Sequence, residues 1–386
     1  MHAFTSVTAN YLPKAAVLAR TLKRTNPEVT FHLLISDDLP DDCPKAILES
    51  FDSIVTIWDL PLTNLDSWTF KHSVVELCTA VKGPMVEYLF DRVGAERVYY
   101  FDPDMVVVGS LAELNARLSQ HAVVLTPHQT VPETSLQAIV DNEICSLAHG
   151  VYNLGFLGVR RTEEGLKFVR WWADRLRLFC HDDIPRGLFT DQRWVDLAPA
   201  FFDGIGVLRD PGYNVATWNL STRRATGQSP WNIQINGRPL VFYHFSGLDS
   251  GAQLTMLERY GRESPVLFEL RDWYLAECES YGQSLLGNRT SRWGCYDNGE
   301  PITHEQRVVY RNRLDLQQAF PNPYRTQPVS KSYFHWFAAN HRKMILRRDK
   351  PEPAIRTMIR RHSHRPPLKW AKKAWHALRT SPPPTI

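Results

Sequence analysis

The pattern of apolar and polar positions over residues 1–101 predicts strands and helices in turn. Short apolar runs predict strands at 3–8, 31–36, 54–58 and 97–101. Stretches with helical spacing predict helices at 10–23, 43–51, 73–81 and 84–93. Asn10 is the expected cap of the first helix, and Pro13 falls in its first turn, where proline is tolerated. This β-α-β-α order predicts an α/β fold with a mainly parallel sheet and helices on both faces.

The pattern beyond residue 108 is more mixed. It predicts a strand at 122–126, a strand or hairpin at 152–159, and helices at 133–147, 162–180 and 264–287. Asn236-Gly237 predicts a hairpin turn between the apolar stretches 232–235 and 240–245. Beyond about residue 295 the composition shifts toward proline, arginine and histidine. We therefore expect a main domain over 1–290 and a basic, helical or irregular extension over 291–386.

Composition places the chain among ordinary globular proteins. Its 386 residues are 43% hydrophobic and 22% charged, which is enough apolar surface for a large core and excludes a disordered chain. The six cysteines show no C-x-x-C spacing, so a zinc ribbon or redox motif is not expected. They are typical of scattered thiols in a reducing compartment. Neither a signal peptide nor a membrane span is predicted, and we expect a cytoplasmic location.

Charge is concentrated at the C-terminal end. Residues 341–379 hold 13 Lys and Arg against 2 acidic residues, whereas the rest of the chain holds 32 basic and 39 acidic residues. Within this segment, residues 368–378 place apolar side chains at helical spacing with lysines between them. That pattern predicts an amphipathic helix on an anionic membrane, at the inner face of the cell membrane. A solvated basic helix packed on the body is the alternative, and no nucleic-acid-binding motif accompanies the charge.

The sequence Tyr99-Tyr-Phe-Asp102-Pro-Asp104 carries the clearest chemical signal. Two carboxylates, one residue apart, follow a buried strand and precede a second apolar run. Mn²⁺ and Mg²⁺ prefer oxygen ligands, and such an ion can neutralise a diphosphate as its bond to a sugar breaks. A solvated turn is the alternative, because Asp and Pro are common in turns. We expect Asp102 and Asp104 to bind a metal ion.

Other candidate residues follow at the ends of later predicted elements. His244 ends an apolar run before Gly247 and is a candidate third metal ligand, since imidazole also binds Mn²⁺. Asp191 and Gln192 stand where a helix begins, so they are either substrate contacts or simple N-capping residues.

Three further residues, Asn153, Gly155 and Lys82, are candidates for direct contact with a ligand. Asn153 and Gly155 lie in a glycine-spaced run, where the glycine either admits a ligand close to the backbone or marks a bulge. Lys82 either reaches a diphosphate or is an exposed lysine at a helix end.

The order of these motifs resembles the glycogenin-like, family-8-type retaining glycosyltransferases and their bacterial relatives that build cell-surface glycans. The resemblance spans roughly residues 2–250 and rests on five loose motifs in the right order. They are Ala3-Phe-Thr with Asn10-Tyr-Leu-Pro, Tyr100-Phe-Asp-Pro-Asp-Met, Tyr152-Asn-Leu-Gly-Phe, Asp191-Gln and His244-Phe-Ser-Gly. It implies a GT-A fold, which is a Rossmann-like mixed sheet flanked by helices.

The same resemblance implies a nucleotide-diphosphate sugar donor, commonly a UDP-sugar, with Mn²⁺ or Mg²⁺. It assigns the metal to Asp102, Asp104 and His244, the sugar to Asp191 and Gln192, and the donor and acceptor region to Asn153 and Gly155. It places the base and ribose of the donor near Thr5, Thr8, Tyr11 and Asp37. The family usually carries a lysine shortly after the His-Phe-x-Gly motif, and residues 248–253 offer none, so phosphate contact is expected from Lys82 or an arginine.

The leading hypothesis is therefore an enzyme that transfers a hexose to a glycan or lipid-linked acceptor in polysaccharide synthesis, with retention. A sugar nucleotidyltransferase is an alternative that would need a glycine-rich loop after the first strand, and residues 5–13 contain no glycine. A catalytically inactive glycan-binding protein is the third hypothesis, and the intact set of candidate acidic residues argues against it.

Overall fold

The computed structural model describes the backbone of residues 1–345 and the side chains of residues 1–340. The chain divides into two compact units, residues 1–326 and residues 327–386. The described part of the second unit is a short 3-10 turn followed by α17 (Tyr333–Ile345). The predicted membrane contact over 341–379 lies outside the described side chains. Within the described residues, no helix has the length and apolar character that crossing a membrane requires.

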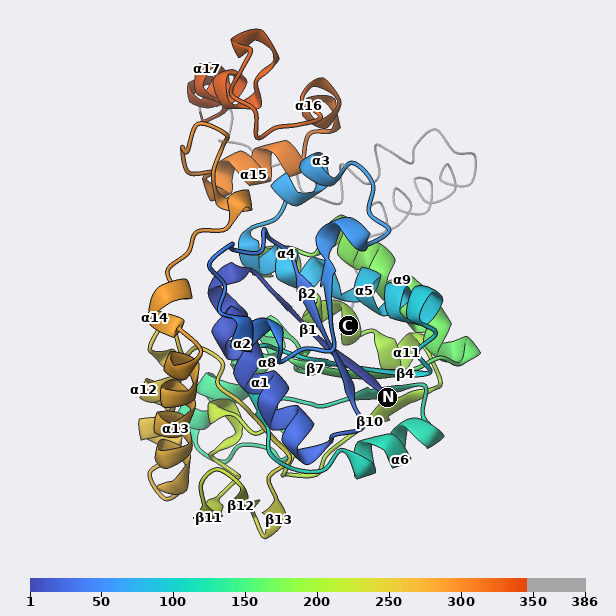
Figure 1. Cartoon of the computed structure of the whole chain (residues 1–386), viewed down its shortest axis with the longest axis vertical. Helices are drawn as coiled ribbons and strands as arrows, with labels where there is room; N and C mark the ends of the chain where they lie inside the picture. The colour runs from blue at the N-terminus through green and yellow to red at the C-terminus, as the bar shows by residue number, and fades with distance from the viewer. Residues whose placement is uncertain (346–386) are drawn as a thin grey trace, which may run out of the picture. The chain divides into compact units, whose positions relative to one another are not determined.

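A seven-stranded sheet forms the centre of the first unit (Figure 1). Its strands are β1 (His2–Val7), β2 (Thr30–Ile35), β3 (Ser53–Thr56), β4 (Arg97–Phe101), β6 (Val123–Leu125), β7 (Phe156–Arg160) and β10 (Ile205–Val207). Their order is β10-β6-β7-β4-β1-β2-β3. Every neighbouring pair is parallel except the two that β7 makes with β4 and β6. The predicted mixed, mainly parallel α/β sheet is confirmed.

Helices cover both faces of this sheet (Figure 1). Those that pack on it include α1 (Leu12–Thr25), α2 (Lys45–Leu48), α4 (Val74–Ala80), α5 (Lys82–Tyr88), α6 (Ala112–Gln120) and α9 (Glu163–Phe179). The remaining helices are α3 (Leu65–Phe70), α7 (Leu136–Ala138), α8 (Cys145–His149), α10 (Gln192–Val195), α11 (Ala198–Phe201), α12 (Ala252–Tyr260), α13 (Val266–Ser280), α14 (Gln283–Leu286), α15 (His304–Arg311) and α16 (Leu314–Ala319).

The main sheet has an apolar layer on each face, because neighbouring side chains of a strand point to opposite faces. Phe4 and Tyr100 join the cluster that α4, α5 and α9 cover. Ala3 and Tyr99 join the cluster that α1 and α6 cover. The continuous apolar run of β4 is therefore buried on both faces, as expected for a central strand.

A second set of strands lies beside the main sheet. It comprises β5 (Met105–Val107), β11 (Ala225–Gln228), β12 (Asn232–Ile235), β13 (Arg238–Pro239) and β14 (Phe242–His244), while β8 (Asp182–Asp183) and β9 (Leu188–Phe189) form a separate pair. The predicted Asn236-Gly237 turn is confirmed, with φ of 50° and 78°. The predicted hairpin partner is wrong, because β12 pairs with β13 whereas β14 pairs with β5. Leu240 N still donates to Ile233 O at 2.9 Å, and only after this contact does the chain leave β12 to pair with β5.

Several predicted boundaries also differ from the structure. Asn10 does not cap a helix: it lies in a 3-10 turn before α1, and its Oδ1 accepts a hydrogen bond of 2.7 Å from Thr8 Oγ1. Pro13 lies in the first turn of α1, as predicted. The strand or hairpin predicted at 152–159 is a strand that begins only at Phe156, because a turn at residues 154–155 separates it from an isolated bridge between Tyr152 and Pro127. Helix α3 was not predicted at all.

Residues 291–326 pack on the main sheet and its helices. Trp293 is buried in the cluster under α4 and α5, and its Nε1 donates to Ser36 O at 2.6 Å. Arg307 is buried and donates to His72 O at 2.6 Å and Phe70 O at 3.1 Å. This segment belongs to the 1–326 unit, and a functional boundary at residue 290 stays a prediction.

Candidate functional site

Asp102, Asp104 and His244 converge at the carboxyl end of β4. The chain leaves β4 through Asp102-Pro-Asp104 and enters β5, whose pairing with β14 sets His244 opposite Met105. His244 Nε2 lies 3.1 Å from Asp104 Oδ1 and 3.7 Å from Asp102 Oδ2. One ligand atom from each of the three side chains can be chosen so that all lie within 4.8 Å of one another. This spacing and this mixture of carboxylate oxygens and imidazole nitrogen suit Mn²⁺.

The imidazole of His244 is held from its other side. Its Nδ1 lies 3.3 Å from Asn153 Oδ1, which also accepts from Gly155 N at 3.1 Å and Asn214 Nδ2 at 3.1 Å. The oxygen can only accept, so the proton of a neutral imidazole lies on Nδ1 and the lone pair of Nε2 faces the carboxylates. An outer hydrogen bond of this kind is typical of histidines that bind metals.

The electrostatics of the trio favour a positive charge between its members. Burial acts to lower the pKa of His244, but the Asp104 and Asp102 carboxylates outweigh burial and raise it. Burial acts to raise the pKa of Asp104, and the facing His244 outweighs it and lowers that pKa. A metal ion would supply this positive charge while leaving the imidazole neutral, so the residues present fit a divalent cation.

Gly155 is required by close packing around the imidazole. A Cβ at this position would lie 2.6 Å from His244 Cε1, 2.6 Å from Met105 Cε and 2.8 Å from Asn153 Oδ1. The glycine therefore leaves space for the imidazole of His244, and the close approach of a ligand to its backbone stays a prediction.

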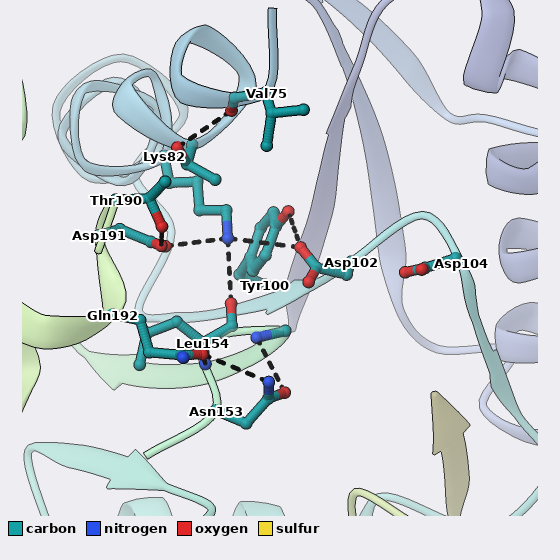
Figure 2. Close-up of polar contacts among 12 residues, drawn as sticks. Val75, Lys82, Tyr100, Asp102, Asp104, Asn153, Leu154, Thr190, Asp191 and Gln192 are labelled. Carbon is teal, nitrogen blue, oxygen red and sulfur yellow. Dashed lines mark hydrogen bonds and ion pairs between the residues drawn. The ribbon is translucent and has the colours of Figure 1, made fainter. Parts of the chain in front are cut away.

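Lys82 joins Asp102 to Asp191 (Figure 2). Its ammonium group lies 2.9 Å from Asp191 Oδ2 and 3.3 Å from Asp102 Oδ1, and it donates to Leu154 O at 3.0 Å. It also sits 4.1 Å above the ring of Tyr100. The side chain is only 2% exposed, so the alternative of an exposed lysine at a helix end is wrong. Burial acts to lower the pKa of Lys82, but the two carboxylates outweigh it and raise that pKa.

Asp191 is buried next to this lysine and does not cap α10 through its side chain. Its Oδ1 accepts from Thr190 Oγ1 at 3.1 Å, and Thr190 has a φ of 43°, which is uncommon for a residue with a Cβ. Burial raises the pKa of Asp191, and Lys82 opposes this rise without cancelling it.

Both the oxygen and the nitrogen of the Gln192 side-chain amide form hydrogen bonds within the protein. Its Oε1 accepts from Leu154 N at 3.0 Å and from Asn153 Nδ2 at 3.3 Å, while its Nε2 donates to His149 O at 3.0 Å. Gln192 thus fixes the segment that carries Asn153, whose oxygen in turn orients His244. A direct contact between Gln192 and a sugar stays a prediction.

The residues predicted to bind the base and ribose of the donor have no side-chain hydrogen bond to one another within residues 1–340, and they do not form one bonded cluster as the metal-binding trio does. The buried Thr5 Oγ1 has no hydrogen-bond partner within residues 1–340, and Thr8 bonds to Asn10. Tyr11 donates to Asp249 Oδ2 at 2.5 Å. Asp37 accepts from Asp38 N at 2.9 Å and from Arg292 N at 3.1 Å, and burial raises the pKa of Asp37. Asp37 is thus tied to the segment 291–326 rather than to the metal ligands.

Three residues that support the site were missed by the sequence analysis. Tyr100 donates to Asp102 Oδ1 at 2.5 Å, and its position two residues before Asp102 on a strand was a usable signal, since such residues share a face. Asn214 contacts Asn153, and Trp218 packs edge-on against His244 with ring centroids 5.2 Å apart. Both lie between β10 and β11, where the described structure has only a 3-10 turn at Thr217–Asn219, and this stretch gave no periodic signal.

Comparison with known proteins finds sequence relatives of undetermined activity. No protein-family model matches the chain. The chain is 29% identical over 175 residues to YfnD of Bacillus subtilis (strain 168), covering 45% of this chain and 53% of YfnD. It is 26% identical over 152 residues to YfnF of the same organism, covering 39% of this chain and 50% of YfnF. Both are described as uncharacterized proteins, and the matches span about half of their length.

Among solved structures, the chain is similar to the galactosyltransferase LgtC in complex with donor and acceptor sugar analogues. That match has a TM-score of 0.40 and 16% identity, and it covers 76% of this chain and 99% of LgtC. The glycosyltransferase GlyE of Streptococcus pneumoniae TIGR4 matches with a TM-score of 0.39 and 15% identity, over 72% of this chain and 64% of GlyE. Mouse xyloside xylosyltransferase 1 matches with a TM-score of 0.36 and 15% identity, over 64% of this chain and 97% of that chain.

Proposed function

We propose that this chain is a metal-dependent glycosyltransferase of the GT-A type, which transfers a hexose from a nucleotide-diphosphate sugar to a glycan or lipid-linked acceptor. The observation that carries the proposal is the convergence of Asp102, Asp104 and His244 beside the buried pair of Lys82 and Asp191. The ordered motifs shared with retaining glycosyltransferases support the same activity.

Under this proposal, Asp102, Asp104 and His244 hold Mn²⁺ or Mg²⁺. The ion would neutralise the diphosphate that leaves the sugar. Asn153 contributes by orienting His244 through Nδ1, and Gly155 by leaving space for the imidazole. Gln192 holds the segment that carries both residues.

The donor that we propose is a UDP-sugar, with its base and ribose near Thr5, Thr8, Tyr11 and Asp37. The buried and unpaired hydroxyl of Thr5 is compatible with a polar ligand at the end of β1. Asp191, aligned by Thr190 and Lys82, would stabilise positive charge that develops on the sugar as the leaving group departs. Transfer within such an ion pair would retain the anomeric configuration.

A role in cell-surface polysaccharide synthesis is part of the proposal. The enzyme would act in the cytoplasm, at the inner face of the cell membrane. The motif resemblance and the basic composition of residues 341–379 support this placement.

The test is sugar transfer to water across a panel of nucleotide sugars, with and without Mn²⁺. We expect one donor to be hydrolysed in a Mn²⁺-dependent way, and Asp104→Asn to lower the rate by about 100-fold or more, since several kcal/mol of charge stabilisation is removed. Asp91→Asn, at a side chain that is 70% exposed, is the matched control and should leave the rate unchanged. If no nucleotide sugar binds in a metal-dependent way, the proposal is wrong.

A further inference from the structure

Lys14 is a buried cation whose ion-pair partner, Asp249, is about half exposed. It lies in the first turn of α1, and its side chain is 3% exposed. Its ammonium group lies 2.6 Å from both carboxylate oxygens of Asp249 and 3.9 Å above the ring of Tyr11. The Asp249 side chain is 51% exposed. Within residues 1–340, these two oxygens are the hydrogen-bond acceptors of the Lys14 ammonium group.

This placement is poor for stability. Burying an ammonium group is costly unless a well-ordered counter-ion compensates, and a half-exposed carboxylate compensates weakly. The first turn of a helix adds to the cost, because the positive end of the helix dipole disfavours a cation there. Lys14, Tyr11 and this helix end together form an environment that attracts an anion, and the Asp249 carboxylate now fills it.

Asp249 lies on the loop between β14 and α12, which also connects to the metal-binding trio. The start of this loop is fixed, because Phe245 N donates to Asp104 O at 2.8 Å. Gly247 and Gly251, with φ of 78° and 77°, flank Asp249 in conformations that glycine adopts without strain.

Charge links this cluster to the metal site as well. Burial raises the pKa of Tyr11, its hydrogen bond to Asp249 raises it further, and the charges of Asp104 and Asp102 add to the rise. The cluster therefore lies within electrostatic reach of the carboxylates that would hold the ion.

We propose that Lys14 binds a phosphate group of the donor, and that Asp249 occupies the place of this phosphate until the donor arrives. This inference rests on the proposed function, because it assigns the residue that contacts the diphosphate. A phosphate oxygen would accept from Lys14 Nζ as the carboxylate of Asp249 does now. The diphosphate would then lie between the metal-binding trio and Lys14.

If Asp249 left Lys14, its side chain would have a cavity to enter and Arg271 as a second cation to bind. A cavity of about 270 Å³ is lined by Lys14, Asp249 and Arg271, among others. Arg271 is largely buried there, and its Nε donates to Gln253 Oε1 at 3.0 Å. When Asp249 leaves Lys14, this guanidinium group offers it a second cation in the same cavity.

The test uses the two ends of the ion pair, because the proposal gives them opposite effects. Binding of UDP with Mn²⁺ would be measured by calorimetry for wild type, Lys14→Gln and Asp249→Asn. We expect Lys14→Gln to weaken UDP binding by about 10- to 100-fold, as the loss of a charge-assisted hydrogen bond predicts, and to leave uridine binding unchanged. Asp249→Asn should strengthen UDP binding several-fold, because a competing carboxylate is removed.

The matched control is the ion pair between Lys23 and Asp52, which lies near the other end of the same helix. Lys23→Gln and Asp52→Asn should both leave UDP binding unchanged. If Lys14→Gln and Asp249→Asn weaken UDP binding alike, or if neither changes it, the ion pair is only structural and the proposal is overturned.

Inorganic pyrophosphate, added without metal, separates this inference from the proposed function. If wild type binds no nucleoside diphosphate, the proposed function fails. Pyrophosphate binding that is lost in Lys14→Gln and strengthened in Asp249→Asn would then still establish the anion site. Failure to bind pyrophosphate as well as UDP would overturn both.

Discussion

Replacing Lys82 with methionine removes the ammonium group between Asp102 and Asp191 and keeps an unbranched side chain in its place. Lys82 and Asp191 are 2% and 3% exposed, so the change leaves a buried carboxylate without its cation. Breaking a buried ion pair from one side costs about 3 to 5 kcal/mol of unfolding free energy. Protonation of Asp191 limits this cost, because at pH 7 a carboxyl with an unfolded pKa near 3.9 can be neutralised for about 4 kcal/mol.

Because Asp191 can be neutralised by a proton, the stability that Lys82→Met loses should depend on pH. Burial raises the pKa of Asp191 and Lys82 now opposes the rise, so removing Lys82 raises the pKa further. A carboxyl whose folded pKa exceeds its unfolded value destabilises the fold above the unfolded value, with a slope of up to about 1.4 kcal/mol per pH unit. Between pH 5 and 7, the gap between wild type and Lys82→Met should widen by up to about 2.7 kcal/mol. The stability difference stops widening once the pH exceeds the pKa of Asp191 in the folded variant.

The assay is denaturant unfolding at pH 5, 6 and 7 in the presence of a chelator. Lys167→Met is the control, since its ion pairs with Glu163 and Glu164 lie on the exposed face of α9, and it should show no pH-dependent gap. A gap of equal size at all three pH values would show that Lys82 contributes through packing rather than charge. A gap below about 1 kcal/mol at pH 7 would refute the reasoning altogether.

Two further substitutions test the packing of the site and the burial of a histidine. Gly155→Ala would place a Cβ 2.6 Å from His244 Cε1, so the affinity for Mn²⁺, measured by electron paramagnetic resonance, should fall by about 10-fold or more. Gly294→Ala is the control: its Cβ would lie 3.2 Å from Thr290 Cγ2, and it should leave the Mn²⁺ affinity unchanged. Burial, aided by Arg311, lowers the pKa of His181 to about 4, so its neutral form stabilises the fold above pH 6.5 and this contribution is lost as pH falls toward 4. His181→Gln should remove roughly 3 kcal/mol of that pH dependence in denaturant unfolding, and an unchanged slope would contradict the burial of a neutral imidazole.

The central sheet could be predicted because its strands are buried on both faces. The run Val98–Phe101 is unbroken, aliphatic and aromatic, and the structure places it in β4 (Arg97–Phe101) between β1 and β7. The two aspartates that follow it were recognisable for the same reason, since charged residues directly after a buried strand stand at the ligand-binding edge. Helix α9 was equally clear, with Thr162 as its cap.

The pairing that brings His244 to Asp104 could not be read from local pattern. An Asn-Gly turn predicts pairing between the residues on either side of it, and β12 and β13 do pair in this way. The chain then leaves that ladder, and β14 pairs with β5, which is distant in the sequence. Propensity describes which residues form strands, but the choice of a distant partner depends on packing in three dimensions.

Lys82 shows the same limit for a single side chain. A lysine at the start of a helix is usually exposed, and its own segment gives no reason to expect burial. The acceptors that bury it come from the end of β4, from the loop before β7 and from the start of α10. Only the assembled sheet brings these three together, so the sequence could name Lys82 as a candidate but not the carboxylates that hold it.

The two aspartates of the Asp-Pro-Asp turn serve different networks, although one residue separates them. Both face His244, but Asp102 also contacts Lys82 and Tyr100, whereas Asp104 makes none of the contacts drawn with Lys82 (Figure 2). The reason is topological, because β4 belongs to the main sheet while β5 leaves it to pair with β14. Asp102 thus connects the trio to the Lys82–Asp191 pair, and Asp104 connects it to the loop that carries Asp249, because Asp104 O accepts from Phe245 N at 2.8 Å. Under the proposed function, the sugar and the diphosphate of one donor would be bound by two structural parts that this turn connects.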